Sequence, residues 1–240
     1  PSVLVNSSSI SYVTCSGFNN GSITINPNGG TGPYTYLWSN GDTTQVLINI
    51  PSGQYFVSIL DSNNCFAIDT IMMLQPNQLN DSVIIISPTC FGSNDGNLSV
   101  IASGGTVPYN YLWNTGDTSS SLQNISAGQY IVSVIDSNGC ILYDTLNVSQ
   151  PNAILVNDSI NDVSCHGYSD GDISLSISGG TGAYSLLWAN GDTLFYRNQL
   201  SSAWYNISIL DSNNCFHLDS FMVMQPAQLT NNSILTSPTC

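Results

Sequence analysis

The chain has 240 residues and carries 15 acidic side chains against a single cationic one, so its formal net charge is -14. This balance removes the Lys and Arg side chains that hold phosphates and anionic lipids, which excludes nucleic acid and acidic membrane surfaces as partners. No run reaches about 18 consecutive apolar residues, so we expect no membrane insertion in this segment.

Seven cysteines follow one another at strictly alternating long and short intervals, and they define a repeat. They stand at positions 15, 65, 90, 140, 165, 215 and 240. The repeat predicts module 1 (1–75), module 2 (76–150) and module 3 (151–225), followed by residues 226–240 as the first strand of a fourth module. We therefore expect the natural polypeptide to be longer. Arrays of small modules without insertions are typical of structural repeat proteins.

Short runs of alternating apolar and polar residues, bounded by Gly, Asn, Asp and Pro, predict an all-β fold. In module 1 the expected strands, in chain order, are Val3–Ser9, Ser22–Asn26, Tyr34–Ser39, Gln45–Ile50, Tyr55–Asp61 and Phe66–Leu74. Six short strands in one module fit a β-sandwich. Trp38 ends a run with an aromatic residue at every second position, so we expect it and its equivalents, Trp113 and Trp188, in the core.

A turn followed by a tyrosine recurs before the fifth expected strand of each module. It covers Ile50–Tyr55, Ile125–Tyr130 and Leu200–Tyr205. The pattern resembles the tyrosine corner of immunoglobulin-like folds. We predict tandem immunoglobulin-like β-sandwiches that form an elongated rod or fibre.

Each module also carries a fixed series of short motifs: Cys with Gly two residues later, Gly-Gly-Thr before an aromatic strand ending in Trp, Asp-x-Asn-x-Cys, and a closing Gln-Pro. This series resembles the SprB-type repeat of giant Bacteroidota surface adhesins. The resemblance implies a cell-surface adhesin exported by the type IX secretion system and, in gliding species, moved by the gliding machinery. Ala183, Leu186 and Arg197 depart from the pattern in module 3.

Regular cysteines in small modules indicate disulfides made in an extracellular, oxidising space. Bridges within a module, such as Cys15–Cys65, close loops of about 50 residues and would stabilise each module by roughly 4 kcal/mol. In an immunoglobulin-like sandwich, however, these loops lie at opposite poles, about 26 Å apart along an eight-residue strand, whereas a disulfide allows about 6 Å. Bridges between neighbouring modules, such as Cys15–Cys140, are the alternative. Both pairings stay open for the candidates Cys15, Cys65, Cys90, Cys140, Cys165 and Cys215, and Cys240 is expected to be unpaired.

Residues that could carry chemistry are few. The turns at 61–64 and 94–96 are rich in Asp and Asn, which suits Ca²⁺, but tight turns demand the same residues and the EF-hand spacing is absent. His166 and His217 stand alone, and no Gly-x-Ser-x-Gly motif occurs. We expect no enzyme activity and no cofactor. Trp204, which replaces Gln54 and Gln129, is a candidate contact residue.

Six Asp-Ser or Asp-Thr steps followed by a small aliphatic residue or Thr resemble the O-glycosylation acceptor of exported Bacteroidota proteins. The candidate acceptors are Thr43, Thr70, Ser82, Thr145, Ser159 and Thr193. The alternative is chance in a chain rich in Asp and Thr.

The predicted function is that of a repeat segment in a long extracellular surface adhesin or fibre. Its expected partners are neighbouring repeats, other copies of itself, and polysaccharide or solid substrata, with weak contacts summed over many modules. Two alternatives are a self-assembling surface filament and a non-catalytic spacer of a secreted polysaccharide hydrolase.

Overall fold

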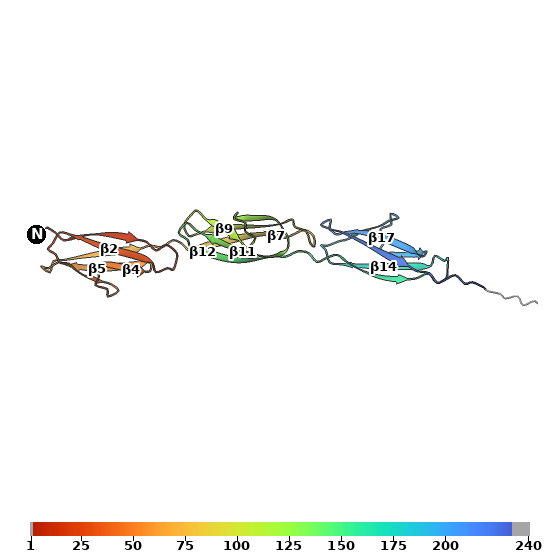
Figure 1. Ribbon diagram of the computed structural model, residues 1–240, viewed down its shortest axis with the longest axis horizontal. Coiled ribbons are helices and arrows are strands. Elements are labelled where there is room, and N and C mark those ends of the chain that lie inside the picture. Colours follow the sequence, from red (N-terminus) through yellow and green to blue (C-terminus); the bar gives the residue numbers. More distant parts are fainter. Residues whose placement is uncertain (1, 232–240) are drawn as a thin grey trace, which may run out of the picture. The chain divides into compact units, whose positions relative to one another are not determined.

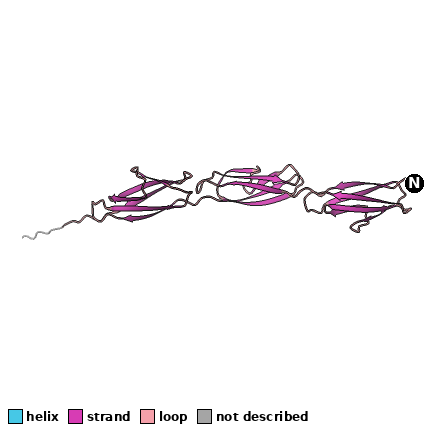
Figure 2. Cartoon of the chain, turned by 180° about the vertical axis from the view of Figure 1, so that it is seen from behind, coloured by secondary structure: helices cyan, strands magenta, loops and turns pink. Residues whose placement is uncertain are grey.

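A computed structural model describes residues 2–231, and over this range the chain is built of strands and loops (Figures 1 and 2). No helix occurs in that range, and so none that is long and apolar enough to cross a membrane. Residues 232–240, which hold Cys240 and most of the expected fourth module, lie outside the described part.

Each module contributes six strands, close to those predicted. Module 1 has β1 (Val5–Ser11), β2 (Gly21–Asn28), β3 (Thr35–Trp38), β4 (Val46–Ile50), β5 (Gly53–Leu60) and β6 (Phe66–Met73). Module 2 has β7 (Asn80–Ile86), β8 (Gly96–Ser103), β9 (Asn110–Trp113), β10 (Ser121–Ile125), β11 (Gly128–Ile135) and β12 (Ile141–Val148). Module 3 has β13 (Leu155–Asn161), β14 (Gly171–Ser178), β15 (Ser185–Trp188), β16 (Tyr196–Leu200), β17 (Ala203–Leu210) and β18 (Phe216–Val223).

The strands of each module form two three-stranded sheets. In module 1 the orders are β1-β2-β4 and β3-β5-β6, and the same division recurs as β10-β8-β7 with β12-β11-β9 and as β13-β14-β16 with β15-β17-β18. Placing the third strand in the sheet of the fifth and sixth, opposite the first, second and fourth, is the arrangement of an immunoglobulin-like sandwich. The predicted fold class is confirmed.

Alternation within the strands places the core between the two sheets. In β2 the buried side is formed by Gly21, Ile23 and Ile25, and Val57 and Ile59 face them from β5. Trp38 is 2% exposed and its Nε1 donates a hydrogen bond to the Thr44 carbonyl at 2.8 Å. Burying the indole while pairing its only donor stabilises the sandwich on both counts.

The tyrosine corner predicted from sequence forms in modules 1 and 3. The hydroxyl of Tyr55 donates to the carbonyl of Pro51 at 3.0 Å, and that of Tyr205 donates to the carbonyl of Ser201 at 2.9 Å. This bond ties the start of the fifth strand to the turn that precedes it.

The chain separates into two compact units that do not coincide with the predicted modules. The first comprises Pro1–Ile85, Leu98–Leu122 and Gln129–Asn147, and the second comprises Ile86–Asn97, Gln123–Gly128 and Val148–Cys240. Each unit thus combines the whole of one end module with part of module 2. The module boundaries themselves stay a prediction.

Candidate functional site

Two disulfides join neighbouring modules, one inside each compact unit. Cys15 bonds Cys140 with an S–S distance of 2.05 Å, and Cys90 bonds Cys215 with a Cα–Cα distance of 5.5 Å. The pairing within modules, which would have joined Cys15 to Cys65, is wrong. The second of the two predicted alternatives is the one found.

The reason lies in the antiparallel topology. Cys15 lies in the turn between β1 and β2, whereas Cys65 lies in the turn between β5 and β6. The second turn is at the other pole, beside the loop that follows β2, because the backbone N–H of Ser62 donates to the Thr31 carbonyl at 2.9 Å. The two cysteines of one module are therefore separated by the length of its strands.

Cys65 and Cys165 are exposed and free. The pairing within modules would have bridged both, whereas the pairing between modules leaves both without a partner in this chain. Cys65 occupies the repeat position of Cys140 and Cys215, and Cys165 occupies that of Cys15 and Cys90. Within this chain no residue stands 125 positions before Cys65 or 125 positions after Cys165, the separation at which the two disulfides form. Cys240 lies beyond the described residues.

An asparagine supports each disulfide with a hydrogen bond between modules. Asn138 donates from Nδ2 to the Thr14 carbonyl at 3.1 Å, and Asn213 does the same to the Thr89 carbonyl at 3.1 Å. Sequence reasoning did not assign this role. The signal was the Asn that stands two residues before the second cysteine of every module.

A buried aspartate holds the turn that carries this asparagine and cysteine. Asp136 is 2% exposed, and its carboxylate accepts backbone N–H bonds from Thr106 at 2.8 Å and from Asn138 and Cys140, both at 2.9 Å. The glycine before Thr106 is required here, because a Cβ on Gly105 would lie 2.6 Å from Asp136 Oδ2. The Gly-Gly-Thr and Asp-x-Asn-x-Cys motifs are thus two halves of one structure.

In the other two modules Asp61 and Asp211 occupy the position of Asp136, and two opposing effects set the pKa of each. Burial raises the pKa of the Asp61 carboxyl. Hydrogen bonds from the backbone N–H groups of Cys65, Thr31 and Asn63 lower this pKa, and together they outweigh burial, so the pKa lies below its ordinary value. The pKa of Asp211 is lowered for the same reasons. Each carboxylate is therefore ionised and fully engaged with the backbone at neutral pH.

The closing Gln-Pro of each module is also fixed. Gln75 accepts a hydrogen bond at Oε1 from the backbone N–H of Gly17 at 2.9 Å, and the bond recurs from Gly92 to Gln150 and from Gly167 to Gln225, each at 2.9 Å. The glycine two residues after the first cysteine thus clamps the segment that leads into the next module.

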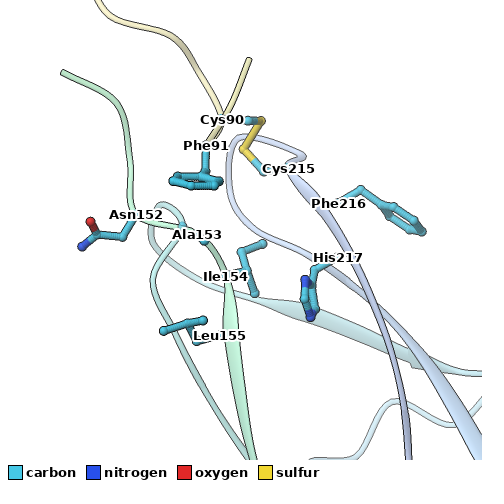
Figure 3. A pocket seen from close by; sticks show the side chains of 10 residues that line it. Cys90, Phe91, Asn152, Ala153, Ile154, Leu155, Cys215, Phe216 and His217 are labelled. Atoms are coloured by element: carbon cyan, nitrogen blue, oxygen red, sulfur yellow. A yellow bond between two sulfur atoms is a disulfide. The ribbon is translucent and has the colours of Figure 1, made fainter. Parts of the chain in front are cut away.

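A shallow pocket of about 360 Å³ lies beside the second disulfide (Figure 3). Phe91, 59% exposed, lies next to the Cys90–Cys215 bond, while Ile154 and His217 line the wall contributed by module 3. The equivalent pocket at the first disulfide measures about 200 Å³ and is lined by Phe18 among others. The lining is mostly apolar, which suits packing between modules rather than chemistry.

The turns weighed as Ca²⁺ sites use their carboxylates internally. Asp61 is engaged as described, and Asp95 accepts hydrogen bonds from Thr89 and Ser93. Hydrogen bonds from the Ser93 and Thr89 hydroxyls, and then from the Thr89 backbone, lower the pKa of Asp95 to about 2. Among residues 2–231 no three His, Cys, Asp or Glu side chains are grouped as a metal site.

The two histidines lie apart, as their sequence contexts suggested. His166 Nδ1 is 3.3 Å from the Pro226 carbonyl oxygen, and His217 Nε2 is 3.9 Å from Asp219 Oδ2. The structure does not bring them together.

The remaining candidate residues lie on the surface. Trp204 is 66% exposed. All six candidate glycosylation acceptors are exposed: Thr43, Thr70, Ser82, Thr145, Ser159 and Thr193. Exposure makes these hydroxyls accessible, and their modification stays a proposal.

The strands and junctions define a protein of tandem immunoglobulin-like repeats joined by disulfides. The repeats are SprB repeats: the SprB repeat family matches residues 7–43, 82–118 and 157–193, and each match begins at the same point of its module. No curated protein sequence matches the chain.

Several solved structures match the chain at low sequence identity. A C-terminal 282-residue fragment of intimin, in complex with the intimin-binding domain of the translocated intimin receptor, is 16% identical with a TM-score of 0.36; the match covers 65% of this chain and 67% of that one. The N-terminal eight immunoglobulin domains of Down syndrome cell adhesion molecule are 10% identical with a TM-score of 0.39, covering 86% of this chain and 34% of that one. Domains 7 to 9 of the S-layer protein SbsC are 9% identical with a TM-score of 0.24, covering 81% and 82%.

Proposed function

We propose that this chain is a tension-bearing segment of an extracellular bacterial surface adhesin, in which SprB repeats are joined into a fibre. The observation that carries the proposal is that both disulfides lie between modules. A bridge within a module would protect that module alone, whereas a bridge to the neighbour resists separation of the two. The match of the repeats to the SprB repeat, which resembles modules of surface adhesins, supports the same function. Export by type IX secretion and a role in gliding are also part of this proposal.

The disulfides shorten the covalent route through the chain. The shortest route between its two ends runs to Cys15, across to Cys140, back to Cys90 and across to Cys215. It contains about 89 backbone steps instead of about 239, so a fully unfolded chain reaches roughly 310 Å rather than roughly 840 Å. Modules that unfold under tension would therefore yield only limited slack.

Adhesion would arise from many weak contacts rather than from one strong site. The acidic surface keeps the array soluble, and repetition raises the effective concentration of each contact. No catalytic group is needed in this function.

Antibody labelling of live source cells against module 2, before and after mild reduction, tests the proposal. We expect label on surface fibres, and blocking antibody should abolish attachment. Reduction should weaken attachment under flow while the label stays on the cell. Label found mainly in the medium, together with a glycan-cleaving partner domain, would instead support the spacer of a secreted hydrolase.

A self-assembling filament is a second candidate because of one repeated surface feature. The outer face of the β3-β5-β6 sheet exposes Leu37, Phe56 and Ile68. Leu112, Ile131 and Tyr143 in module 2, and Leu187 and Leu218 in module 3, are exposed at the same repeat positions. Sedimentation of the purified chain at rising concentration decides whether these rows associate laterally.

A further inference from the structure

Module 3 differs from the other two at a buried position of the fourth strand. Leu47 and Leu122 are core residues there, 2% and 5% exposed, whereas module 3 has Arg197. This is the chain's only cationic residue among Lys and Arg. A guanidinium in place of a core leucine is costly unless its charge is paired and its donors are used.

The structure holds this guanidinium in a defined place. The guanidinium carbon, Cζ of Arg197, lies 4.9 Å from the centroid of the Trp188 ring and 5.2 Å from the centroid of the Tyr205 ring. Its Nε lies 3.4 Å from Asp192 Oδ2, and the arginine side chain is 12% exposed. Two aromatic faces and an ion pair together fix its position.

Most of its hydrogen-bonding capacity remains available. A guanidinium carries five N–H donors. Among residues 2–231 the structure gives Arg197 the ion pair with Asp192 and no other hydrogen-bond acceptor. No nitrogen of Arg197 is among the fully buried side-chain atoms that lack a partner, so its unused donors reach the adjoining space and can bond an oxygen-bearing ligand there.

That space is a pocket of about 310 Å³ that also contains an exposed indole. Its lining includes Arg197, Trp204, Asn190 and Asn206. Trp204 is 66% exposed and replaces the Gln54 and Gln129 of the other modules. Two unusual residues of module 3, a cation and an exposed aromatic, thus meet at one pocket.

These groups together suit a sugar ring. The indole offers an apolar face on which the C–H face of a pyranose can stack, while the guanidinium and the two asparagine amides can bond its hydroxyls. Asp192 neutralises Arg197, and the chain is strongly acidic, so the surroundings repel an anionic sugar.

We propose that module 3 binds one uncharged hexose unit of a polysaccharide between Arg197 and Trp204. This deepens the proposed adhesive function and rests on it for its biological use, whereas the binding itself is a property of the purified chain. A single small pocket would bind weakly, with a dissociation constant on the order of 1 mM. Affinity at a surface would then come from repetition along the fibre.

The test is an NMR titration of the ¹⁵N-labelled chain with neutral cello-, manno- and galacto-oligosaccharides of four to six units, and with polygalacturonate. We expect at least one neutral oligosaccharide to shift the indole N–H of Trp204 and the amides of Asn190 and Asn206. The equivalent residues of modules 1 and 2 should not move, which makes them internal controls in the same molecule.

The matched variants are Trp204→Gln and Arg197→Leu, each of which installs the residue that modules 1 and 2 carry at that position. Both should therefore fold, as unchanged amide resonances of module 3 away from the pocket would verify. Loss of the indole should weaken binding by about tenfold or more. The proposal is overturned if no neutral oligosaccharide binds at about 10 mM, if both variants bind as the parent does, or if polygalacturonate alone binds. None of these results bears on the cell-surface labelling, so the two proposals fail separately.

Discussion

The Cα atoms of Cys90 and Cys215 lie 5.5 Å apart although their sequence separation is 125. That separation equals one full repeat plus the interval between the two cysteines of a module, so the same bond can be made at every junction of an array. The regular spacing of the cysteines thus allows a disulfide between each pair of neighbouring modules.

Replacing Cys215 by Ser should lower the stability of the junction between modules 2 and 3. Loss of a native disulfide costs about 2–5 kcal/mol in the free energy of unfolding. Urea unfolding followed by tryptophan fluorescence measures the loss, and Cys165→Ser is the control because that thiol is exposed and free. A linked peptide containing Cys165 and Cys215 in non-reducing mapping would contradict the pairing described here.

Asp136→Asn should destabilise module 2. The neutral amide presents N–H groups to a site where three backbone N–H groups converge, so at least one donor is left without a partner. The expected cost is about 2 kcal/mol in the free energy of unfolding. Hydrogen exchange at Thr106, Asn138 and Cys140 should quicken, whereas the equivalent amides of module 3 should exchange at the parent rate.

Acid should weaken the fold at the equivalent aspartates of modules 1 and 3. The pKa values of Asp61 and Asp211 are lowered in the folded chain by the backbone donors, so their stabilising contribution is complete above the ordinary value of 3.8. It is lost as the pH falls through the lower, folded pKa, because the unfolded chain then binds more protons. The midpoint of thermal unfolding should stay level from about pH 8 to about pH 5 and decline below about pH 4. A midpoint that stays level to about pH 2 would show that these carboxylates contribute little.

Gly104→Ala should prevent the loop after β8 from closing. A Cβ there would lie 1.9 Å from the backbone carbonyl oxygen of Gln78, which cannot move as a flexible side chain would. Gly116→Ala is the matched control, since its φ is +87° but no atom lies within 4 Å of the added Cβ. We expect the control to lose about 1 kcal/mol in the free energy of unfolding through backbone strain alone. Equal losses in the two variants, measured by urea unfolding, would contradict the steric explanation.

Pulling the chain by its ends should show the covalent shortcut directly. Under oxidising conditions the unfolded chain should stop extending at roughly 310 Å, and after reduction it should reach roughly 840 Å. Single-molecule force spectroscopy measures both lengths on one molecule. An oxidised extension near the reduced value would mean that the junctions are not bridged.

The sequence by itself determined the strands, the sandwich and the repeat. Alternation in a segment such as Ser22–Asn26 is local, since successive side chains of a strand face opposite sides, and it needs no knowledge of distant residues. The aromatic run that ends at Trp38 and the turn before Tyr55 likewise signalled burial and a tyrosine corner from a few residues each.

Only the tertiary structure decided what depends on distance. The pairing of Cys15 with Cys140 follows from which pole of one module meets which pole of the next, and spacing along the chain is compatible with either choice. The carboxylate of Asp61 finds the backbone of Thr31 thirty residues away, and Arg197 finds Trp188 and Tyr205 on the opposite sheet. Such contacts exist only after the sheets have packed, because the chain between the partners must first be folded back.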